Sequence, residues 1–233
     1  MINGSFDLPY GVHPAHDNIF TAHGWSPWWS DRKWPDQDQN VNRPIATPEY
    51  KAITLLDDAQ RVLDGDSCQC LFVFGKLMQA GVFQRVPVAA GKRCTFGVAF
   101  ETWCSQSDNP RVSDAELYLR VGIDKRGGTD WEADSIVWGN WVRGAPEYAR
   151  TAISAVAECD EVTLWIHAWN KWAVRHNDCY LDAATFEVEG EQPPPPPPEP
   201  GDVLRVEVSG TLHIVNDSPG LLAKIRALLM GGV

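Results

Sequence analysis

Hydrophobic and polar residues alternate with a period of two along much of residues 1–190. Successive side chains of a β-strand point to opposite faces, so this pattern predicts strands rather than helices. Short clusters rich in Gly, Asp, Asn and Pro fall between the alternating segments and predict turns. Residues 48–63 have apolar positions at helical spacing and fit either a short helix or a loop. We expect strands at residues 2–8, 69–76, 82–88, 93–104, 115–124, 134–142, 146–156, 161–170 and 178–188.

The number and spacing of these segments indicate the fold class. Many short strands separated by turns are typical of an all-β protein, and we predict that residues 1–190 form a jelly-roll β-sandwich. A hexaproline, Pro193 to Pro198, predicts a semi-rigid polyproline linker over residues 191–201. Residues 202–233 combine an alternating stretch with an amphipathic one, which predicts a small strand–helix tail. Because so short a segment cannot bury its own core, the tail is a candidate unit for oligomerisation or anchoring.

Three of the predicted strands, 93–104, 115–124 and 161–170, have one apolar face and one face rich in aromatic and charged residues. The apolar faces are expected to form the core. Aromatic rings stack on the C–H faces of sugars and charged groups bind sugar hydroxyls, so the other face is a candidate carbohydrate site. The alternative is that the N-terminal loop covers this face and makes its aromatic residues a second core layer. If the three strands belong to one sheet, its outer face carries Glu101, Trp103, Glu116, Tyr118, Arg120, Trp165, His167 and Trp169.

The N-terminal loop is itself a second candidate binding region. Residues 23–35 have neither a strand nor a helix period and contain Trp25, Trp28, Trp29 and Trp34. Loops carry binding residues more often than the elements they connect, so the last three indoles join the candidate ligand-binding residues. The alternative is that one or two of these indoles fill an end of the sandwich.

The composition narrows the classes of partner. The chain has 11 Trp among 233 residues, and a small domain rarely buries so many indoles without leaving some at a working surface. Its net charge of −11 and its lack of a basic run argue against a nucleic-acid partner. No run of about 18 apolar residues predicts a membrane span, and no signal peptide is visible at the start. The six Cys lack the spacing of a zinc or redox motif. Cys70 and Cys94 fall on apolar faces of predicted strands, which favours free thiols over disulfides and leaves the pairing of the six open.

Four short motifs occur in order along the chain: Asn3–Asp7, Ala80–Val86, Gly91–Phe96 and Cys179–Phe186. Together they resemble motifs of the jelly-roll carbohydrate-binding modules that are attached to bacterial xylanases and glucanases. The third motif departs from the family pattern, since Cys94 stands where the family usually has an aromatic residue. The resemblance implies a concave, aromatic-lined sheet face that binds an oligo- or polysaccharide, and a location outside the cell or at the surface of a cell or virion.

The same resemblance implies a structural calcium ion, because the family binds one where its first and last strands meet. Carried over to this sequence, the implied ligands are Asp7 and Asp182, with Asp64 or Asp66 as a further oxygen ligand. The alternative is that Asp7 and Asp182 are ordinary carboxylates at the edge of a strand.

The favoured function is carbohydrate binding without catalysis, so we do not expect an enzyme. One alternative is a structural protein of a virion or cell surface that displays the sandwich and forms homo-oligomers through its tail. A lesser alternative is a jelly-roll glycoside hydrolase, which needs two carboxyl groups about 5–9 Å apart. Glu101 and Glu116 are the candidate pair for that chemistry.

Overall fold

The computed structural model describes residues 1–38, 45–190, 207–208 and 212–213. Contacts within the chain divide it into two units, Met1–Glu191 and Gln192–Val233. The first unit is built from strands, with one short α-helix and one 3-10 helix. Its elements are β1 (Tyr10–His13), β2 (His16–Ala22), β3 (Ser26–Trp29), β4 (Glu49–Thr54), α1 (Leu55–Asp58), η1 (Ala59–Arg61), β5 (Ser67–Phe74), β6 (Gln79–Pro87), β7 (Arg93–Ser105), β8 (Leu117–Asp124), β9 (Ile136–Trp138), β10 (Val142–Arg143), β11 (Ala149–Val156), β12 (Glu161–Asn170) and β13 (His176–Val188).

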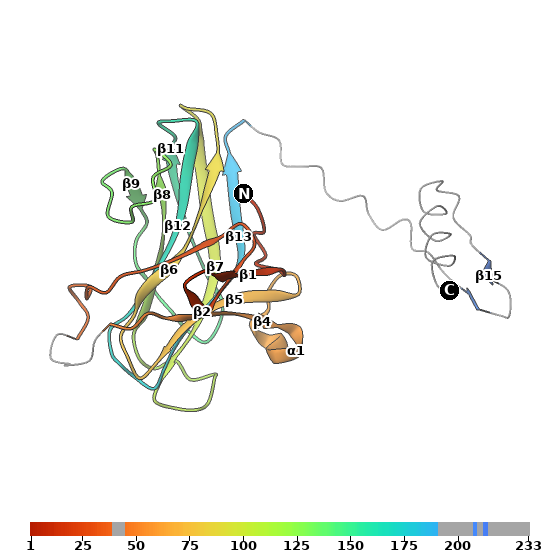
Figure 1. Cartoon of the computed structure of the whole chain (residues 1–233), viewed down its shortest axis with the longest axis vertical. Coiled ribbons are helices and arrows are strands. Elements are labelled where there is room, and N and C mark those ends of the chain that lie inside the picture. Colours follow the sequence, from red (N-terminus) through yellow and green to blue (C-terminus); the bar gives the residue numbers. More distant parts are fainter. Residues whose placement is uncertain (39–44, 191–206, 209–211, 214–233) are drawn as a thin grey trace. The chain divides into compact units, whose positions relative to one another are not determined.

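The strands of the first unit form two sheets, shown in Figure 1. The seven-stranded sheet has the order β1-β2-β4-β5-β13-β7-β11. The six-stranded sheet has the order β10-β8-β12-β6-β3, with β9 paired to β8. Most neighbours in both sheets are antiparallel and far apart in the sequence, as in β12 with β6 and β13 with β5. The chain is therefore an all-β sandwich, which confirms the predicted fold class.

The core lies between the inner faces of the two sheets. β7 contributes Phe96, Val98 and Phe100 from one sheet, while β12 contributes Leu164 and Ile166 from the other, and all five are buried. Removing each such side chain from water stabilises the fold by about 1.5–3 kcal/mol. This burial confirms the apolar faces that the alternation predicted.

The position of β12 determines which polar and aromatic residues meet on the outside of the six-stranded sheet. β12 lies between β6 and β8, with Trp169 opposite Tyr118 and His167 opposite Arg120. Side chains of directly opposed residues lie on the same face and within contact distance. The register therefore brings the aromatic and charged residues of β8 and β12 together.

Residues 2–8 do not form the predicted strand. Asn3 and Phe6 both have φ of 51°, which is outside the strand region. The Asn3 side-chain amide donates to the Asp7 carbonyl at 2.7 Å, and its oxygen accepts from the Asp7 N–H at 2.8 Å. Such local hydrogen bonds compete with strand pairing and stabilise a turn instead.

Three further segments differ from the prediction. Residues 10–29, expected as a loop for most of their length, form β1, β2 and β3, and residues 48–63 form β4 before α1 and η1. The strand expected at 134–142 is reduced to β9 and the start of β10. These strands are short and are stabilised by partners distant in the sequence, so the period of two is too brief to reveal them.

In the second unit, β14 (Glu207–Val208) pairs antiparallel with β15 (Leu212–His213). The predicted polyproline linker and tail helix lie outside the described residues. All six cysteines are free thiols, and all but Cys159 are buried. In the part of the chain that the structure describes, no helix is long and apolar enough to cross a membrane.

Candidate functional site

The predicted binding face is divided between two sheets. β8 and β12 belong to the six-stranded sheet, whereas β7 lies in the seven-stranded sheet between β13 and β11. Glu101 and Trp103 of β7 are therefore on the opposite side of the sandwich from Tyr118, Arg120 and the β12 residues. The condition that all three strands belong to one sheet is not met, because alternation shows which residues share a face of a strand and not which strands pair.

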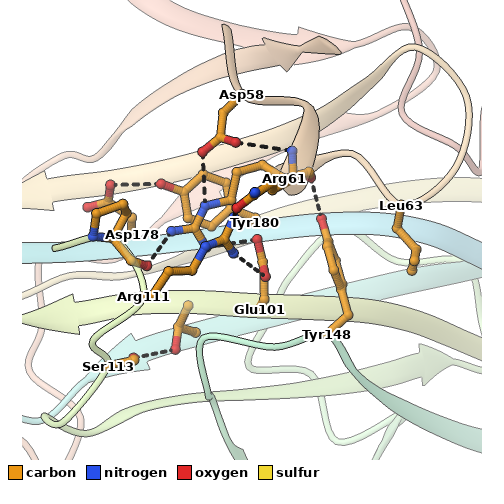
Figure 2. Close-up of polar contacts among 12 residues, drawn as sticks. Asp58, Arg61, Leu63, Glu101, Arg111, Ser113, Tyr148, Asp178 and Tyr180 are labelled. Carbon is orange, nitrogen blue, oxygen red and sulfur yellow. Dashed lines mark hydrogen bonds and ion pairs between the residues drawn. The ribbon is translucent and has the colours of Figure 1, made fainter.

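Glu101 is a structural partner and is not available to a ligand. Its side chain is 2% exposed, and its carboxylate accepts from Arg61 Nη1 at 2.8 Å. The Arg61 guanidinium lies 4.2 Å from the Tyr180 ring centroid, and Asp58 lies 3.7 Å from its Nε. Figure 2 shows Arg61 of η1 reaching over the outer face of the seven-stranded sheet to Glu101. The assignment of Glu101 to a sugar site is therefore wrong.

Trp103 is partly exposed on the same outer face. It stacks on His176 with ring centroids 3.6 Å apart, and its Nε1 donates to the Ser107 carbonyl at 3.1 Å. His176 Nε2 lies 2.9 Å from an Asp108 carboxylate oxygen. Trp103 thus belongs to a separate small cluster on the seven-stranded sheet and does not join the other candidate residues.

The aromatic residues of β12 are covered by other parts of the chain. Trp165, His167 and Trp169 are 1%, 0% and 3% exposed. Trp28 of β3 lies against Trp165, with ring centroids 5.9 Å apart, and stacks on Trp131 at 5.2 Å. These rings form a second core layer outside the six-stranded sheet, so the expectation that they present an open surface is wrong. The covering segments are β3 and the region around β9, which the alternation of β12 does not reveal.

His167 is the centre of this layer. Burial, and next the charge of Arg120, lower its pKa well below the ordinary value of a histidine, so the imidazole is neutral at neutral pH. Its Nε2 has no hydrogen-bond partner among the described residues. The ring centroids of five indoles lie between 4.8 and 5.6 Å from that of His167: Trp28, Trp34, Trp131, Trp138 and Trp141.

Arg120 extends from β8 into the same layer. Its guanidinium carbon lies 4.1 Å from the Trp138 centroid, 4.3 Å from Trp141 and 5.1 Å from Trp34. Arg120 Nη2 approaches His167 Nδ1 at 3.4 Å. Burial without a neighbouring carboxylate lowers the pKa of Arg120 to about 10, which still leaves it charged at neutral pH. Cation–π contacts with the indoles therefore stabilise this cation in the absence of an ion pair.

An open pocket of about 310 Å³ lies beside this layer. It is lined by Asp36, Tyr118, Trp141, Trp169 and Lys171. Tyr118 stacks on Trp169, with ring centroids 4.9 Å apart and planes at 23°. Since Tyr118 and Trp141 are only partly buried, their rings are available to a ligand in the pocket.

The polar groups at the pocket are ordered by Glu116. Its carboxylate accepts from the Tyr118 hydroxyl at 2.5 Å, from Lys171 Nζ at 3.2 Å and from Trp172 Nε1 at 3.3 Å. The hydrogen bond from Tyr118 is the main cause that lowers the pKa of Glu116, so this carboxylate is ionised at neutral pH. The pocket therefore combines aromatic walls with an ammonium and carboxylates in defined positions.

The remaining candidate residues of the N-terminal loop have different roles. Trp29 lies edge-on to His13 and His16 and packs against the main core. Trp34 lies edge-on to Trp141, with centroids 5.3 Å apart, and belongs to the second layer. Trp28 is 7% exposed, and its Nε1 donates to the Ile166 carbonyl at 3.0 Å. Of these indoles, Trp34 lies nearest to the pocket through its contact with Trp141.

Three residues that line the pocket were not among the predicted site residues: Asp36, Trp141 and Lys171. Trp141 follows Trp138 after two residues at the end of a predicted strand, and that pair of indoles is the one signal that could have singled it out. Asp36 and Lys171 lie in connections whose positions depend on the tertiary fold.

The carboxylates implied as calcium ligands accept hydrogen bonds from backbone N–H groups. Asp182 accepts from Leu63 at 2.7 Å and Asp64 at 3.1 Å. Asp7 accepts from Asp66 at 2.6 Å. Within the described ranges, no three His, Cys, Asp or Glu side chains are grouped to hold a metal ion. In this arrangement the carboxylates of Asp7 and Asp182 stabilise the 63–67 loop through its backbone N–H groups. The calcium ion stays a prediction.

The two glutamates considered for glycosidase chemistry lie on different sheets. Glu101 is in β7 of the seven-stranded sheet, and Glu116 immediately precedes β8 of the six-stranded sheet. Two carboxyls must flank one glycosidic bond to cleave it. This pair is therefore wrong as a catalytic pair.

Comparison with solved structures finds chains of similar fold. A Stig cyclase from Fischerella sp. TAU, in complex with (3Z)-3-(1-methyl-2-pyrrolidinylidene)-3H-indole, is 14% identical with a TM-score of 0.50, over 81% of this chain and 96% of that chain. TmCBM61 in complex with beta-1,4-galactotriose is 10% identical with a TM-score of 0.47, over 72% and 90%. A CBM4 structure is 12% identical with a TM-score of 0.42, over 80% and 98%.

At these identities the likeness concerns the fold alone. A shared fold does not by itself select between binding and catalysis. No protein-family model matches the chain, and no curated protein matches its sequence.

Proposed function

We propose that residues 1–190 bind carbohydrate without cutting it, in the pocket lined by Tyr118, Trp141 and Trp169. The observation that supports this proposal is the open pocket itself, which has aromatic walls and lies beside an otherwise covered aromatic layer. A sugar ring presents C–H groups that stack on an aromatic face and hydroxyls that need polar partners at its edge. Lys171, Asp36 and Glu116 supply such partners around the Tyr118 ring.

The volume of the pocket suits a small part of a glycan. About 310 Å³ lies at the lower end of the range for small-molecule sites, roughly 300–1,000 Å³. We therefore propose that one or two sugar residues occupy it while the rest of the glycan lies outside. The nearly buried Trp169 supports Tyr118 by stacking, so the ring needs little reordering when a ligand binds.

The test is a titration of the full chain with a panel of neutral and acidic oligosaccharides, followed by tryptophan fluorescence and calorimetry. We expect Tyr118→Ala to weaken binding about tenfold or more, because loss of a central aromatic contact costs ~1.4 kcal/mol or more. Tyr118→Phe keeps the ring and should retain most of the affinity. Incubation with each bound glycan should release no new reducing ends.

Phe74→Ala is the matched control for the loss of an aromatic ring. Phe74 is 62% exposed on β5, in the sheet opposite the pocket. We expect this variant to bind like the wild type. Absence of binding to every glycan in the panel, or an equal loss in Phe74→Ala and Tyr118→Ala, would contradict the proposal.

A further inference from the structure

Arg120 is a partly buried cation with few hydrogen-bond partners among the described residues. A guanidinium has five N–H donors, and buried donors in folded proteins are almost always paired. Arg120 Nε has no partner among the described residues, and Nη2 reaches only His167 Nδ1 at 3.4 Å. The faces of the guanidinium are covered by Trp138 and Trp141, so only its N–H edges can bind a further group.

Other buried donors without a partner lie on the face of β12 that Arg120 meets through His167. Trp165 Nε1, His167 Nε2 and Trp169 Nε1 also lack partners in the described part of the chain. All three side chains are at least nine-tenths buried on the outer side of β12. Each unpaired buried group costs free energy in the unbound state. Several such groups in one place are therefore typical of a site where a bound ligand supplies the missing hydrogen-bond partners.

The pocket and Arg120 are adjacent. Trp141 lines the pocket and also covers one face of the Arg120 guanidinium. Tyr118 and Arg120 are two residues apart on β8 and point to the same side, which places their backbones about 7 Å apart. A substituent on a sugar ring stacked at Tyr118 can therefore reach the Arg120 edge, which is itself partly exposed.

We infer that the preferred ligand is an acidic sugar, such as a uronic acid, whose carboxylate pairs with Arg120 while its ring occupies the pocket. This inference rests on the proposed carbohydrate binding and names the class of sugar. The planar fork of an arginine matches the two oxygens of a carboxylate, and such charge-assisted bonds are stronger than neutral ones. Because the chain has a net charge of −11, it does not attract polyanions without a specific site.

The test compares acidic oligosaccharides with their own carboxyl-reduced, neutral forms. Di- and trisaccharides of glucuronic and galacturonic acid are titrated into the full chain by calorimetry, each beside its reduced form and a sulfated neutral oligosaccharide. We expect the wild type to bind the acidic form at least about tenfold more tightly than the reduced form. Arg120→Gln should remove this preference for the acidic form, whereas Tyr118→Ala should weaken binding of both forms and keep the preference.

The outcomes separate this inference from the proposed function. Equal affinity of the wild type for acidic and reduced forms, or tighter binding of the sulfated form, would overturn the inference and leave carbohydrate binding supported. An unchanged preference in Arg120→Gln would also overturn it. Failure of every sugar to bind would instead overturn the proposed function, and the inference with it.

Two controls exclude a purely structural role of Arg120. Arg126→Gln removes an exposed arginine next to β8 that pairs with Glu158, and it should keep the preference for the acidic form. Thermal unfolding of Arg120→Gln and Arg120→Met without ligand should occur at or above the wild-type temperature, because the substitution removes an unpaired buried charge. The comparison of acidic and reduced sugars on the wild type needs no variant and decides the inference even if both variants unfold.

Discussion

Arg61 and Arg120 lie on the outer faces of opposite sheets, and the chain compensates their charges in different ways. Arg61 is 1% exposed and pairs with Glu101, which is 2% exposed. Arg120 has indoles around it and no carboxylate partner in the described residues. The opposite charge of its partner compensates a buried charge in an ion pair. A buried charge without such a partner lowers the stability of the fold unless a ligand of opposite charge binds to it. This difference is why we assign structure to Arg61 and ligand binding to Arg120.

His167 makes stability depend on pH in a defined direction. Its pKa in the folded state is depressed, so the unfolded chain binds a proton below about pH 6.5 while the folded chain does not. We expect the free energy of unfolding to fall by up to about 1.4 kcal/mol for each pH unit below 6.5, until the folded pKa is reached. Thermal unfolding of the wild type and of His167→Gln, measured from roughly one pH unit above 6.5 to roughly one and a half units below it, reports this loss.

The comparison with His167→Gln is needed because Asp182 acts in the opposite direction. Burial raises the pKa of Asp182 to about 6, so the folded state takes up a proton before the unfolded state does. That uptake stabilises the fold as the pH falls below about 6. The difference between wild type and variant isolates His167, and a difference that stays constant with pH would contradict its assignment as a neutral buried histidine.

At the scale of elements, η1 is attached to the seven-stranded sheet largely through hydrogen bonds of Arg61. Arg61 donates to Glu101 at 2.8 Å and to the Pro110 carbonyl at 2.6 Å, and Tyr148 donates to the Arg61 carbonyl at 2.7 Å. Figure 2 shows Arg61, Glu101 and Tyr148 converging from η1, β7 and the segment just before β11. α1, which leads directly into η1, buries no apolar residue of its own, since Leu55 and Leu56 are exposed. Its position therefore depends on Arg61.

Arg61→Ala should destabilise the protein by up to about 3–5 kcal/mol, because it leaves the buried Glu101 carboxylate with only the 3.9 Å contact to Arg111. Denaturant unfolding measures this change. Arg85→Ala is the matched control, since Arg85 forms an exposed pair with Glu161 and such pairs contribute about 0–1 kcal/mol. Equal losses in the two variants would show that the Arg61 pair is not buried as described. Glycan binding should survive in both, as both residues lie away from the pocket lining.

At the scale of the whole first unit, Asp7 and Asp182 connect three separate segments. Asp182 of β13 accepts from the N–H groups of Leu63 and Asp64, while Asp7 near the N-terminus accepts from Asp66 and Ser67 in the same loop. These bonds connect the N-terminal turn and β13 through the loop before β5. The carboxylates thus have a role in closing this end of the sandwich.

Because N–H groups already occupy these carboxylates, we expect EDTA to leave the melting temperature of the full chain unchanged unless the predicted calcium ion binds beside them. Asp182→Ala should lower the free energy of unfolding by about 2 kcal/mol, since it leaves backbone N–H groups unpaired. Differential scanning calorimetry with EDTA, and again with added calcium, measures both effects. A fall in the wild-type melting temperature on chelation, absent in Asp182→Ala, would instead support the calcium ion that the motifs imply.

Alternation of apolar and polar residues determined the sandwich and its inner faces from the sequence alone. Phe96, Leu119 and Ile166 are buried where the period of two places them, because a strand with one apolar face must bury it. The Trp-rich composition likewise pointed to an aromatic site. An extracellular or surface location, oligomerisation through the tail and the calcium ion remain predictions.

Only the tertiary structure decided which faces belong together and which indoles remain open. Glu101 and Tyr118 have the same kind of position in their strands, yet strand pairing separates them onto opposite sheets. Trp169 and Trp141 contribute to the same pocket, although one lies in a strand and the other in a connection. The pairing of strands and the burial of indoles beneath loops both depend on contacts between residues far apart in the chain. A local pattern of apolar and polar residues carries no information about such contacts.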